Sequence, residues 1–189
     1  MSLEQAIAAL RAPAGVALVP TSTLYGLSGR AADTESNHRI ARIKQRPVGP
    51  LIVLVDRMPA GLAGKGLEAV WPGPVTVLVS PDVLDVPVSS ANLGPDGRVA
   101  VRWDPDPDAQ ALIAAVGPIT STSANLHGEP PLRDPGACPF PVDAVIDQGV
   151  LPERPPSTLV DWDAGVILRA GAQAERVREL LAARQPSAS

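Results

Sequence analysis

The sequence predicts an α/β protein built on a mixed parallel and antiparallel sheet with flanking helices. Short apolar runs typical of buried strands occur throughout the chain, and segments of helical character lie between them. The alternation is not strict, because several strand-like runs follow one another closely in the last third of the sequence. This pattern favours a mixed sheet over a regular doubly wound one.

The first part of the chain is expected to open with a helix. Ser2 and Gln5 have the spacing of a capping box, and Asp33 can cap a second helix in the same way. The expected elements are a helix from Ser2, a strand at 15–20, a loop at 21–29, a helix from Asp33 to near Lys44, a strand at 50–56 and a helical stretch to about Val70.

The second part contains most of the expected strands. Asp106 followed by Pro107 is a typical cap-then-proline start of a helix. The expected elements are strands at 74–80 and 97–103, a helix from 107 to 116, a strand at 117–121, a loop at 122–131, strands at 144–147, 157–161 and 166–169, and a helix at 175–183.

Length and composition indicate one globular domain, which we place at residues 1–184 with a frayed tail at 185–189. The net charge of −4 argues against a surface that coats nucleic acid, although a local cationic cleft is compatible with it. Cys138 is the single cysteine, so no internal disulfide or thiolate-rich metal site is expected. No apolar run reaches membrane-spanning length and no signal peptide is recognisable, so we expect a cytoplasmic protein.

Basic residues are concentrated in one segment. Arg39, Arg42, Lys44 and Arg46 fall within eight residues, in a chain that has two lysines in all. Arginine and lysine together are the usual ligands of phosphate groups. A basic helix end that faces solvent is the alternative, and on spacing alone it is slightly favoured.

Three polar segments follow expected strands or begin them. The loop at 19–29 (VPTSTLYGLSG) places hydroxyl groups at a strand end, and the loop at 121–128 (STSANLHG) offers hydroxyl and amide groups for phosphate or ribose oxygens. A similar segment at 89–94 (SSANLG) lacks the strand context, so we prefer the later copy. The hairpin at 156–171 carries a lone Arg169. An ordinary turn and a plain edge hairpin are the alternatives for the first and last of these.

Several common types of site are not supported. The chain has neither a GxxxxGK[ST] segment nor a GxGxxG segment after a strand, which excludes the usual P-loop and dinucleotide signatures. No carboxylate pair or Ser/His/Asp set stands out for covalent or acid–base catalysis.

Six segments, in order, resemble the YrdC-like family of threonylcarbamoyl-AMP synthases. They are PTSTLYGLSG, KQRPVGPLIVLV, WPGPVTVLV, VAVRWDP, TSTSANLHGEP and PSTLVD with VILRAG, and together they span residues 20–171. Each motif is weak alone, but six in the same order are specific. The resemblance implies a twisted mixed sheet around a deep cationic cleft.

The resemblance also implies a reaction and its partners. ATP, L-threonine and bicarbonate give threonylcarbamoyl-AMP and pyrophosphate, with Mg²⁺ required. The enzyme class is a nucleotidyltransferase, and the product enters tRNA threonylcarbamoyladenosine (t6A) formation through a separate transferase complex. A weak contact with tRNA or double-stranded RNA is a further expectation, and no membrane partner is expected.

The family motifs assign roles to individual residues. Lys44 and Arg46 match the K-x-R motif and are the expected catalytic residues. The residues implied to bind ATP are Lys44, Arg46, Ser121, Ser123, Asn125 and Arg169. The residues implied to bind threonine are Thr21, Thr23, Arg102 and Ser157. No protein side chain is assigned to a metal.

The sequence departs from the family pattern in three places. The segment at 47–50 (PVGP) is shorter than in many relatives, Arg98 stands where relatives have a small hydroxyl residue, and Leu54 replaces a histidine of some relatives. Arg98 either contacts phosphate or partly fills the cleft. These departures leave open a catalytically reduced paralogue that binds nucleotide or double-stranded RNA. A carbamoyl-transfer role, as in larger multidomain proteins, is a third interpretation.

Overall fold

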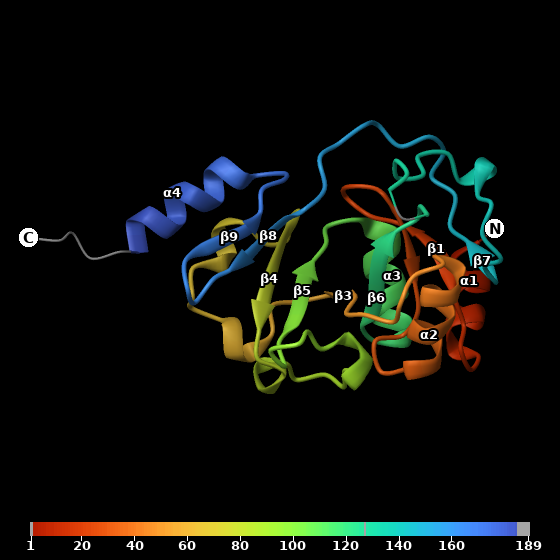
Figure 1. Ribbon diagram of the computed structural model, residues 1–189, viewed down its shortest axis with the longest axis horizontal. Helices are drawn as coiled ribbons and strands as arrows, with labels where there is room; N and C mark the ends of the chain where they lie inside the picture. The colour runs from red at the N-terminus through yellow and green to blue at the C-terminus, as the bar shows by residue number, and fades with distance from the viewer. Residues whose placement is uncertain (1, 127, 185–189) are drawn as a thin grey trace, which may run out of the picture.

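The computed structural model describes residues 2–126 and 128–184, which form a nine-stranded sheet flanked by helices (Figure 1). The strand order is β7-β1-β2-β6-β3-β5-β4-β8-β9. Three neighbouring pairs are parallel (β1/β7, β3/β5 and β4/β8), and the other five are antiparallel. The predicted mixed sheet is therefore confirmed.

The strands are short and mostly apolar. Their bounds are β1 Ala17–Pro20, β2 Tyr25–Ser28, β3 Ile52–Val55, β4 Val75–Val79, β5 Val99–Trp103, β6 Ile119–Ser123, β7 Ala144–Val145, β8 Thr158–Asp161 and β9 Val166–Arg169. Buried β-branched residues dominate them, which is typical of strands covered on both faces.

The α-helices flank the sheet, and the first three begin at the caps that the sequence predicts. Their bounds are α1 Leu3–Arg11, α2 Thr34–Ile43, α3 Pro107–Val116 and α4 Ala174–Arg184. Ser2 and Gln5 complete a capping box on α1, and the Asp33 and Asp106 carboxylates accept backbone N–H groups at the starts of α2 and α3. These caps satisfy amide groups that a helix leaves unpaired in its first turn.

The residues of β1 face two different cores. Ala17 and Val19 pack with α1 and α3, whereas Leu18 packs on the opposite face with Ile40 of α2. Successive strand side chains point to opposite faces, so this alternation places α2 across the sheet from α1 and α3.

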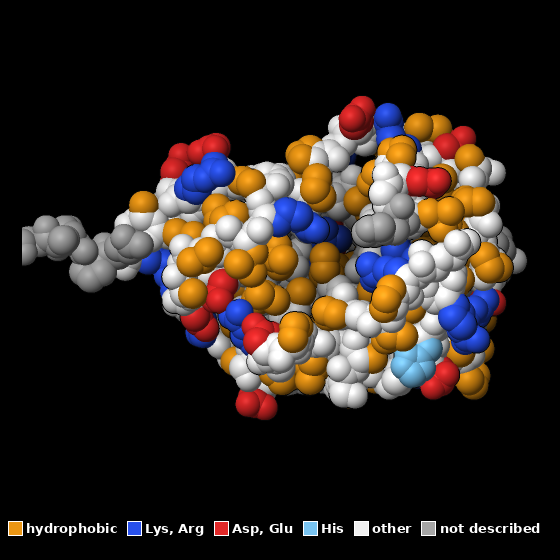
Figure 2. All heavy atoms as spheres, viewed as in Figure 1, with side chains coloured by type: hydrophobic (Ala, Val, Ile, Leu, Met, Phe, Trp, Pro, Cys, Tyr) orange, Lys and Arg blue, Asp and Glu red, His pale blue; other side chains and the backbone are white. Residues whose placement is uncertain are grey.

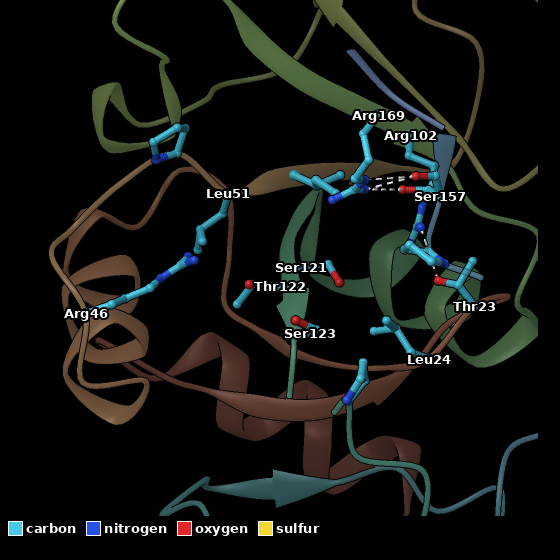
Figure 3. Close-up of a pocket in the computed structure, with 14 residues that line it drawn as sticks. Thr23, Leu24, Arg46, Leu51, Arg102, Ser121, Thr122, Ser123, Ser157 and Arg169 are labelled. Carbon is cyan, nitrogen blue, oxygen red and sulfur yellow. Dashed lines mark hydrogen bonds between the residues drawn. The ribbon is translucent and has the colours of Figure 1, made fainter. Parts of the chain in front are cut away.

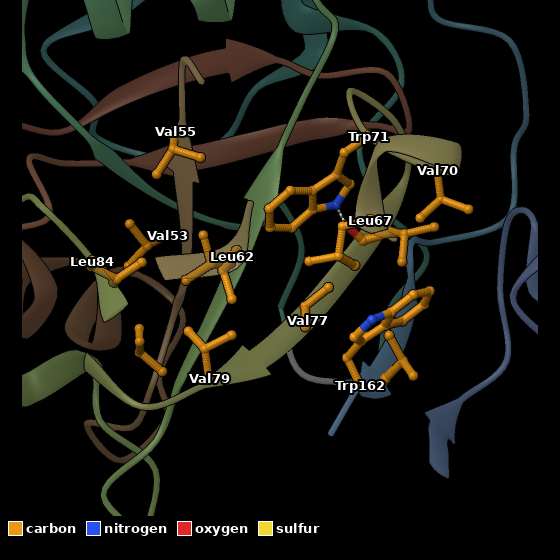
Figure 4. Close-up of a cluster of buried hydrophobic side chains, with 14 of the residues drawn as sticks. Val53, Val55, Leu62, Leu67, Val70, Trp71, Val77, Val79, Leu84 and Trp162 are labelled. Atoms are coloured by element: carbon orange, nitrogen blue, oxygen red, sulfur yellow. Dashed lines mark hydrogen bonds between the residues drawn. The ribbon is translucent and has the colours of Figure 1, made fainter. Parts of the chain in front are cut away.

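A third core fills one face of the other half of the sheet (Figure 4). It contains valines of β3, β4 and β5 together with Trp71 and Trp162. Trp71 Nε1 donates to the Val75 carbonyl at 2.6 Å, and Trp162 Nε1 donates to the Lys65 carbonyl at 2.8 Å. Both indole N–H groups are therefore satisfied inside an apolar cluster.

Because strand side chains alternate, polar residues lie on the sheet face opposite the third core. Val99 and Val101 enter this third core, so Arg102 points the other way. The register pairs Arg102 with Leu54, and Ile52 with Ser121, which places all four residues on one face. Arg102 and Ser121, two polar residues of the predicted site, thus lie on the face opposite the valines.

Three local predictions were wrong. The segment at 21–29 is not a loop throughout, because Tyr25–Ser28 forms β2 and pairs with β1 and β6. The helical stretch up to Val70 is reduced to two 3₁₀ turns, Ala60–Leu62 and Leu67–Ala69, because closely spaced glycines and prolines interrupt it. Strand β6 continues to Ser123, two residues beyond the predicted strand.

The predicted frayed tail at 185–189 lies outside the described residues. Within the described part of the chain, no helix has the length and apolar character needed to cross a membrane.

Substitution of Trp162 tests how much the third core contributes to stability. The Trp162 side chain is 2% exposed, and Arg184 lies over its ring with the guanidinium carbon 4.9 Å from the centroid. We expect Trp162→Ala to lower the free energy of unfolding by about 3–5 kcal/mol in urea denaturation, because the cavity cannot collapse fully. Trp162→Phe, which keeps a ring and loses the N–H bond, is expected to cost less than half as much. A loss below about 1 kcal/mol for the alanine variant would contradict this role.

Candidate active site

A pocket of about 330 Å³ opens on the face that carries Arg102. Its walls come from segments far apart in the sequence, as Figure 3 shows. The lining residues are Thr23, Leu24, Arg46, Pro50, Leu51, Ile52, Arg102, Ser121, Thr122, Ser123, Pro131, Pro156, Ser157 and Arg169. Seven of these were predicted as site residues from the sequence: Thr23, Arg46, Arg102, Ser121, Ser123, Ser157 and Arg169.

Arginine side chains approach the pocket from two sides. Arg46 and Arg169 extend from opposite walls toward the hydroxyl groups of β6, and Figure 2 shows basic side chains on both sides of a central hollow. No carboxylate among the described residues forms an ion pair with either of them. Burial lowers the pKa of each guanidinium from the ordinary arginine value. A pocket with uncompensated cations of this kind is suited to an anion.

The end of α2 separates Lys44 from Arg46. Gln45 has a φ of 50°, and its N–H donates to the Arg42 carbonyl while the Arg46 N–H donates to that of Ala41. This is a Schellman arrangement with Gln45 in the left-handed position that glycine usually occupies. The turn reverses the chain, so Arg46 reaches the pocket while Lys44 points inward.

Lys44 lies behind the pocket and holds the loop that follows β6. It is 4% exposed, and its Nζ donates to the Ser123 carbonyl, to the Asn125 carbonyl at 2.7 Å and to Asn125 Oδ1 at 3.0 Å. Burial, with a smaller contribution from Arg46, lowers the pKa of Lys44 to about 8. The basic cluster of the sequence is also divided, since Arg39 turns away to Asp143.

The β6 hydroxyl groups form the floor between the two arginines. Ser121 Oγ has no hydrogen-bond partner among the described residues, and Ser123 Oγ donates to Asn125 Oδ1 at 2.6 Å, which leaves its lone pairs available. Gly26 pairs with Ser123 on the neighbouring strand, and a Cβ there would lie 2.5 Å from Ser121 Oγ. Any side chain at position 26 would therefore displace this hydroxyl from its present position.

Asn125 and Thr21 lie outside the pocket lining, although both were predicted as ligand-binding residues. The Asn125 amide joins Lys44, Ser123 and the Glu129 carbonyl, so it shapes the loop. Thr21 Oγ1 donates to the Leu24 carbonyl at 2.7 Å and accepts the Leu24 N–H at 3.2 Å. The Thr21 hydroxyl therefore donates its proton inside the turn. Of the two threonines, Thr23 is the one that lines the cavity.

Arg102 is buried at the far end of the pocket. It is 3% exposed, its Nη2 lies 3.1 Å from Asp104 Oδ2, and its Nη1 donates to Thr23 Oγ1 at 3.4 Å. Its Nε has no partner. Burial lowers the pKa of Arg102, the Asp104 charge partly offsets this, and the Arg169 charge adds to it.

Ser157 connects β8 to Arg169. Arg169 Nη2 donates to the Ser157 carbonyl at 3.0 Å and to Ser157 Oγ at 3.2 Å. Ser157 Oγ also lies 2.9 Å from Thr76 Oγ1. The predicted hairpin thus fixes the direction of the Arg169 guanidinium.

Sequence reasoning missed Asp104 and the prolines Pro131 and Pro156 of the pocket lining. Asp104 is fully buried and accepts from the Ser22 N–H at 2.9 Å and from Ser22 Oγ at 2.8 Å. The spacing of Arg102 and Asp104 could have indicated this pair, because residues two apart in an extended chain lie on the same face.

The structure locates Arg98, one of the three departures from the family pattern. Arg98 pairs with Asp96 and Asp161 beside a smaller cavity that shares Arg169 and the Pro50–Ile52 wall with the main pocket. The SSANLG segment at 89–94 packs on α2, where Asn92 Oδ1 accepts from Asn37 Nδ2 at 2.6 Å. This copy therefore has a structural position away from the pocket.

Side chains of the described residues form no group of three His, Cys, Asp or Glu that could hold a metal ion. The pocket lining carries hydroxyl groups and arginines but no carboxylate. Such a lining is compatible with a metal ion carried on the phosphates of a ligand, which is how Mg²⁺ is commonly bound.

Comparison with known proteins places these features in one family. The Sua5/YciO/YrdC family model, whose description is telomere recombination, matches residues 10–171. A threonylcarbamoyl-AMP synthase of Stenotrophomonas maltophilia (strain K279a) is 31% identical over 187 residues, which covers 89% of this chain and 98% of that protein.

Two solved structures are similar. P. abyssi Sua5 complexed with L-threonine superposes with a TM-score of 0.74 at 27% identity, covering 93% of this chain. This chain spans only 56% of that Sua5 chain. E. coli YciO superposes with a TM-score of 0.72 at 27% identity, covering 90% of this chain and 89% of YciO.

The pKa of Lys44 gives a direct test of its buried position. The chain has two lysines, so ¹³Cε-lysine NMR resolves two signals, and Lys44→Arg identifies one of them by its loss. We expect the Lys44 signal to titrate near pH 8: the amine is charged below this pH and neutral above it. A midpoint near 10.5 would show that the amine is not desolvated.

Proposed function

The chain belongs to the Sua5/YciO/YrdC family, and from this premise we propose that it is a threonylcarbamoyl-AMP synthase. It joins L-threonine, bicarbonate and ATP to form threonylcarbamoyl-AMP and pyrophosphate, the first step of t6A formation in tRNA. The observation that carries the proposal is the pocket in which Arg46, Arg102 and Arg169 converge on a floor of hydroxyl groups. The protein is thus a transferase-type enzyme, and transfer of AMP makes it a nucleotidyltransferase.

The reaction proceeds in two bond-forming steps. The neutral amine of threonine attacks the carbon of bicarbonate, and loss of water gives a carbamate. A carbamate oxygen then attacks the α-phosphorus of ATP, and the bond from that phosphorus to the bridging oxygen breaks as pyrophosphate leaves. No covalent enzyme intermediate is needed, in keeping with a pocket lined by arginines and hydroxyl groups.

The main obstacle is repulsion between anions. The threonine carboxylate, the carbamate and the triphosphate must come together in one site. Arginines fixed in a partly desolvated pocket attract such charges more strongly than water does, and the folded framework positions them before the substrates arrive. Arg46 and Arg169 have no acidic partner among the described residues, so their charges are available for this purpose.

We assign threonine to the end of the pocket at Arg102. The guanidinium binds the substrate carboxylate, and the neighbouring Thr23 and Ser157 hydroxyls offer hydrogen bonds to its polar groups. Support comes from the burial of Arg102 and from its contact with Thr23 at 3.4 Å. Thr21 contributes through the turn that presents Thr23.

We assign ATP to the side of the pocket between Arg46 and Arg169. Ser121 and Ser123 provide hydroxyl groups between the two guanidiniums, and Asn125 and Lys44 hold the loop that carries them. In this assignment Lys44 adds positive charge behind the loop and Arg46 contacts the phosphates. The α-phosphorus then lies between the ATP and threonine ends of one pocket.

Mg²⁺ is proposed to enter with ATP. When bound, it shares negative charge on the departing pyrophosphate. At the phosphate end of the pocket, the Ser121 and Ser123 hydroxyl oxygens would be available to Mg²⁺ as ligands. Binding through substrate phosphates is consistent with a lining without carboxylates.

The product is proposed to pass to a tRNA-modifying transferase complex. A mixed anhydride between a carbamate and AMP hydrolyses readily, so prompt transfer to that complex preserves it. Contact with tRNA or double-stranded RNA is a weaker expectation, because the chain carries a net charge of −4.

Threonine-dependent release of pyrophosphate tests the function. With ATP, bicarbonate and Mg²⁺ present, we expect release to require threonine in the wild type. Arg46→Gln and Arg169→Gln are expected to lower kcat/KM by about 10²-fold or more, because each removes a charge that faces the phosphates. Lys44→Ala is expected to abolish release.

Arg57→Gln is the matched control for these variants. Arg57 is exposed and pairs with Asp56 and Asp85 away from the pocket, so its loss should leave release unchanged. ATP binding without threonine-dependent turnover would support the catalytically reduced paralogue instead. RNA retention that falls steeply with salt, again without turnover, would support a binding module.

Removal of divalent metal tests the assignment of Mg²⁺. We expect EDTA to abolish pyrophosphate release and added Mg²⁺ to restore it, while the melting temperature stays the same. An unchanged rate in EDTA would contradict a role for the metal. A large fall in melting temperature would instead indicate that the protein itself holds a metal ion.

A further inference from the structure

The Asp104 carboxylate joins two segments at the threonine end of the pocket. It lies two residues after Arg102, just beyond the end of β5, and it is fully buried. Its Oδ1 accepts the N–H groups of Ser22 at 2.9 Å and of Asp106 at 3.0 Å. Its Oδ2 accepts Ser22 Oγ at 2.8 Å and pairs with Arg102 Nη2 at 3.1 Å. One carboxylate therefore holds both the strand arginine and the turn that presents Thr23.

Arg102 has few other contacts that fix its direction. Its Nε has no hydrogen-bond partner among residues 2–126 and 128–184, and its bond to Thr23 Oγ1 is long at 3.4 Å. The charge of Arg169 is close enough to lower the pKa of Arg102, so the two guanidiniums repel each other. The ion pair with Asp104 is the one short, charged contact that holds Arg102 among the described residues.

We propose that Asp104 is a positioning residue for threonine, which aims the Arg102 guanidinium and sets the Thr21–Thr23 turn against it. The inference rests on the proposed function, since it concerns how that site recognises its amino-acid substrate. Asp104 does not touch the substrate. It acts through Arg102 and Ser22, so its removal affects threonine more than ATP.

The Asp104 charge also has an electrostatic effect of opposite sign on threonine binding. A carboxylate beside Arg102 neutralises part of the charge that attracts the threonine carboxylate. If this screening dominated, removal of the Asp104 charge would tighten threonine binding. If positioning dominates, removal weakens it. The sign of the change in the KM for threonine therefore decides between the two.

Asp104→Asn is the first test. The amide oxygen still accepts the Ser22 and Asp106 N–H groups, whereas the neutral amide no longer forms an ion pair with Arg102. We expect the KM for threonine to rise roughly ten- to hundredfold, as for loss of one charged contact. The KM for ATP is expected to stay within about threefold, and saturating threonine should recover most of kcat.

Asp106→Asn is the matched control. Asp106 is a buried carboxylate two residues further on that caps α3, and an asparagine can also cap. Both KM values should be unchanged in this variant. A KM for threonine that is unchanged or lower in Asp104→Asn overturns the proposal, as does an equal rise in both KM values.

Ser22→Ala gives a milder variant in case Asp104→Asn fails to fold. It removes the hydroxyl bond to Asp104 Oδ2 and leaves the ion pair in place. We expect a two- to fivefold rise in the KM for threonine and no change for ATP. No change in either value would overturn the link between the turn and Asp104.

A substrate-free measurement separates this inference from the proposed function. The Nε–H signal of Arg102, identified by its loss in Arg102→Lys, reports the order of the guanidinium by ¹⁵N relaxation. We expect its order parameter to fall in Asp104→Asn and to stay unchanged in Asp106→Asn. If the wild type releases no pyrophosphate with threonine, the proposed function fails. An unchanged Arg102 signal in Asp104→Asn overturns the positioning role by itself.

Discussion

The buried ion pair of Arg102 and Asp104 is the constraint on which the arrangement of the pocket depends. Both side chains are almost fully buried, and a buried charge is costly unless a partner of opposite sign accompanies it. Residues two apart in an extended chain point to the same face, so Asp104, just beyond the end of β5, can supply the partner of Arg102. The Ser22 turn then completes the hydrogen bonding of the carboxylate, and this draws the end of β1 to the end of β5.

The other cations of the pocket have no such compensation. Arg46 comes from the end of α2 and Arg169 from β9, and the described residues offer neither one an acidic partner. The charge of Arg169 lowers the pKa of Arg102, and the charge of Arg46 lowers that of Lys44. The repulsion within each of these two pairs must be balanced by contacts elsewhere, chiefly the three apolar clusters that hold the nine strands together. Part of the stability of the fold is thus used to hold like charges close, which is a common feature of sites that bind anions.

Most of the sheet and the helix starts could be predicted from the sequence. The apolar runs indicate the strands, and the side chains of Ser2, Asp33 and Asp106 mark the starts of three helices, because these signals are local. Strand β2 could not be found in this way. Its sequence, YGLS, has no clear alternation, and it forms because β1 and β6 pair with it on both sides. Tertiary contacts, rather than local preference, determine this strand.

In the candidate site, too, the sequence identified the residues, whereas their individual surroundings could be seen only in the structure. Motif order identified Arg46, Arg102 and Arg169, and all three line the pocket. Spacing could not reveal that Lys44 and Arg46 have different surroundings, because the K-x-R pattern leaves the conformation of the middle residue open. Gln45 adopts the left-handed region, so the chain reverses between the two cations. The Lys44 side chain is buried against loop carbonyl groups, and the Arg46 side chain faces the cavity. The same two residue types therefore perform two tasks: Lys44 stabilises the loop that carries the hydroxyl floor, and Arg46 presents its charge to the space above that floor.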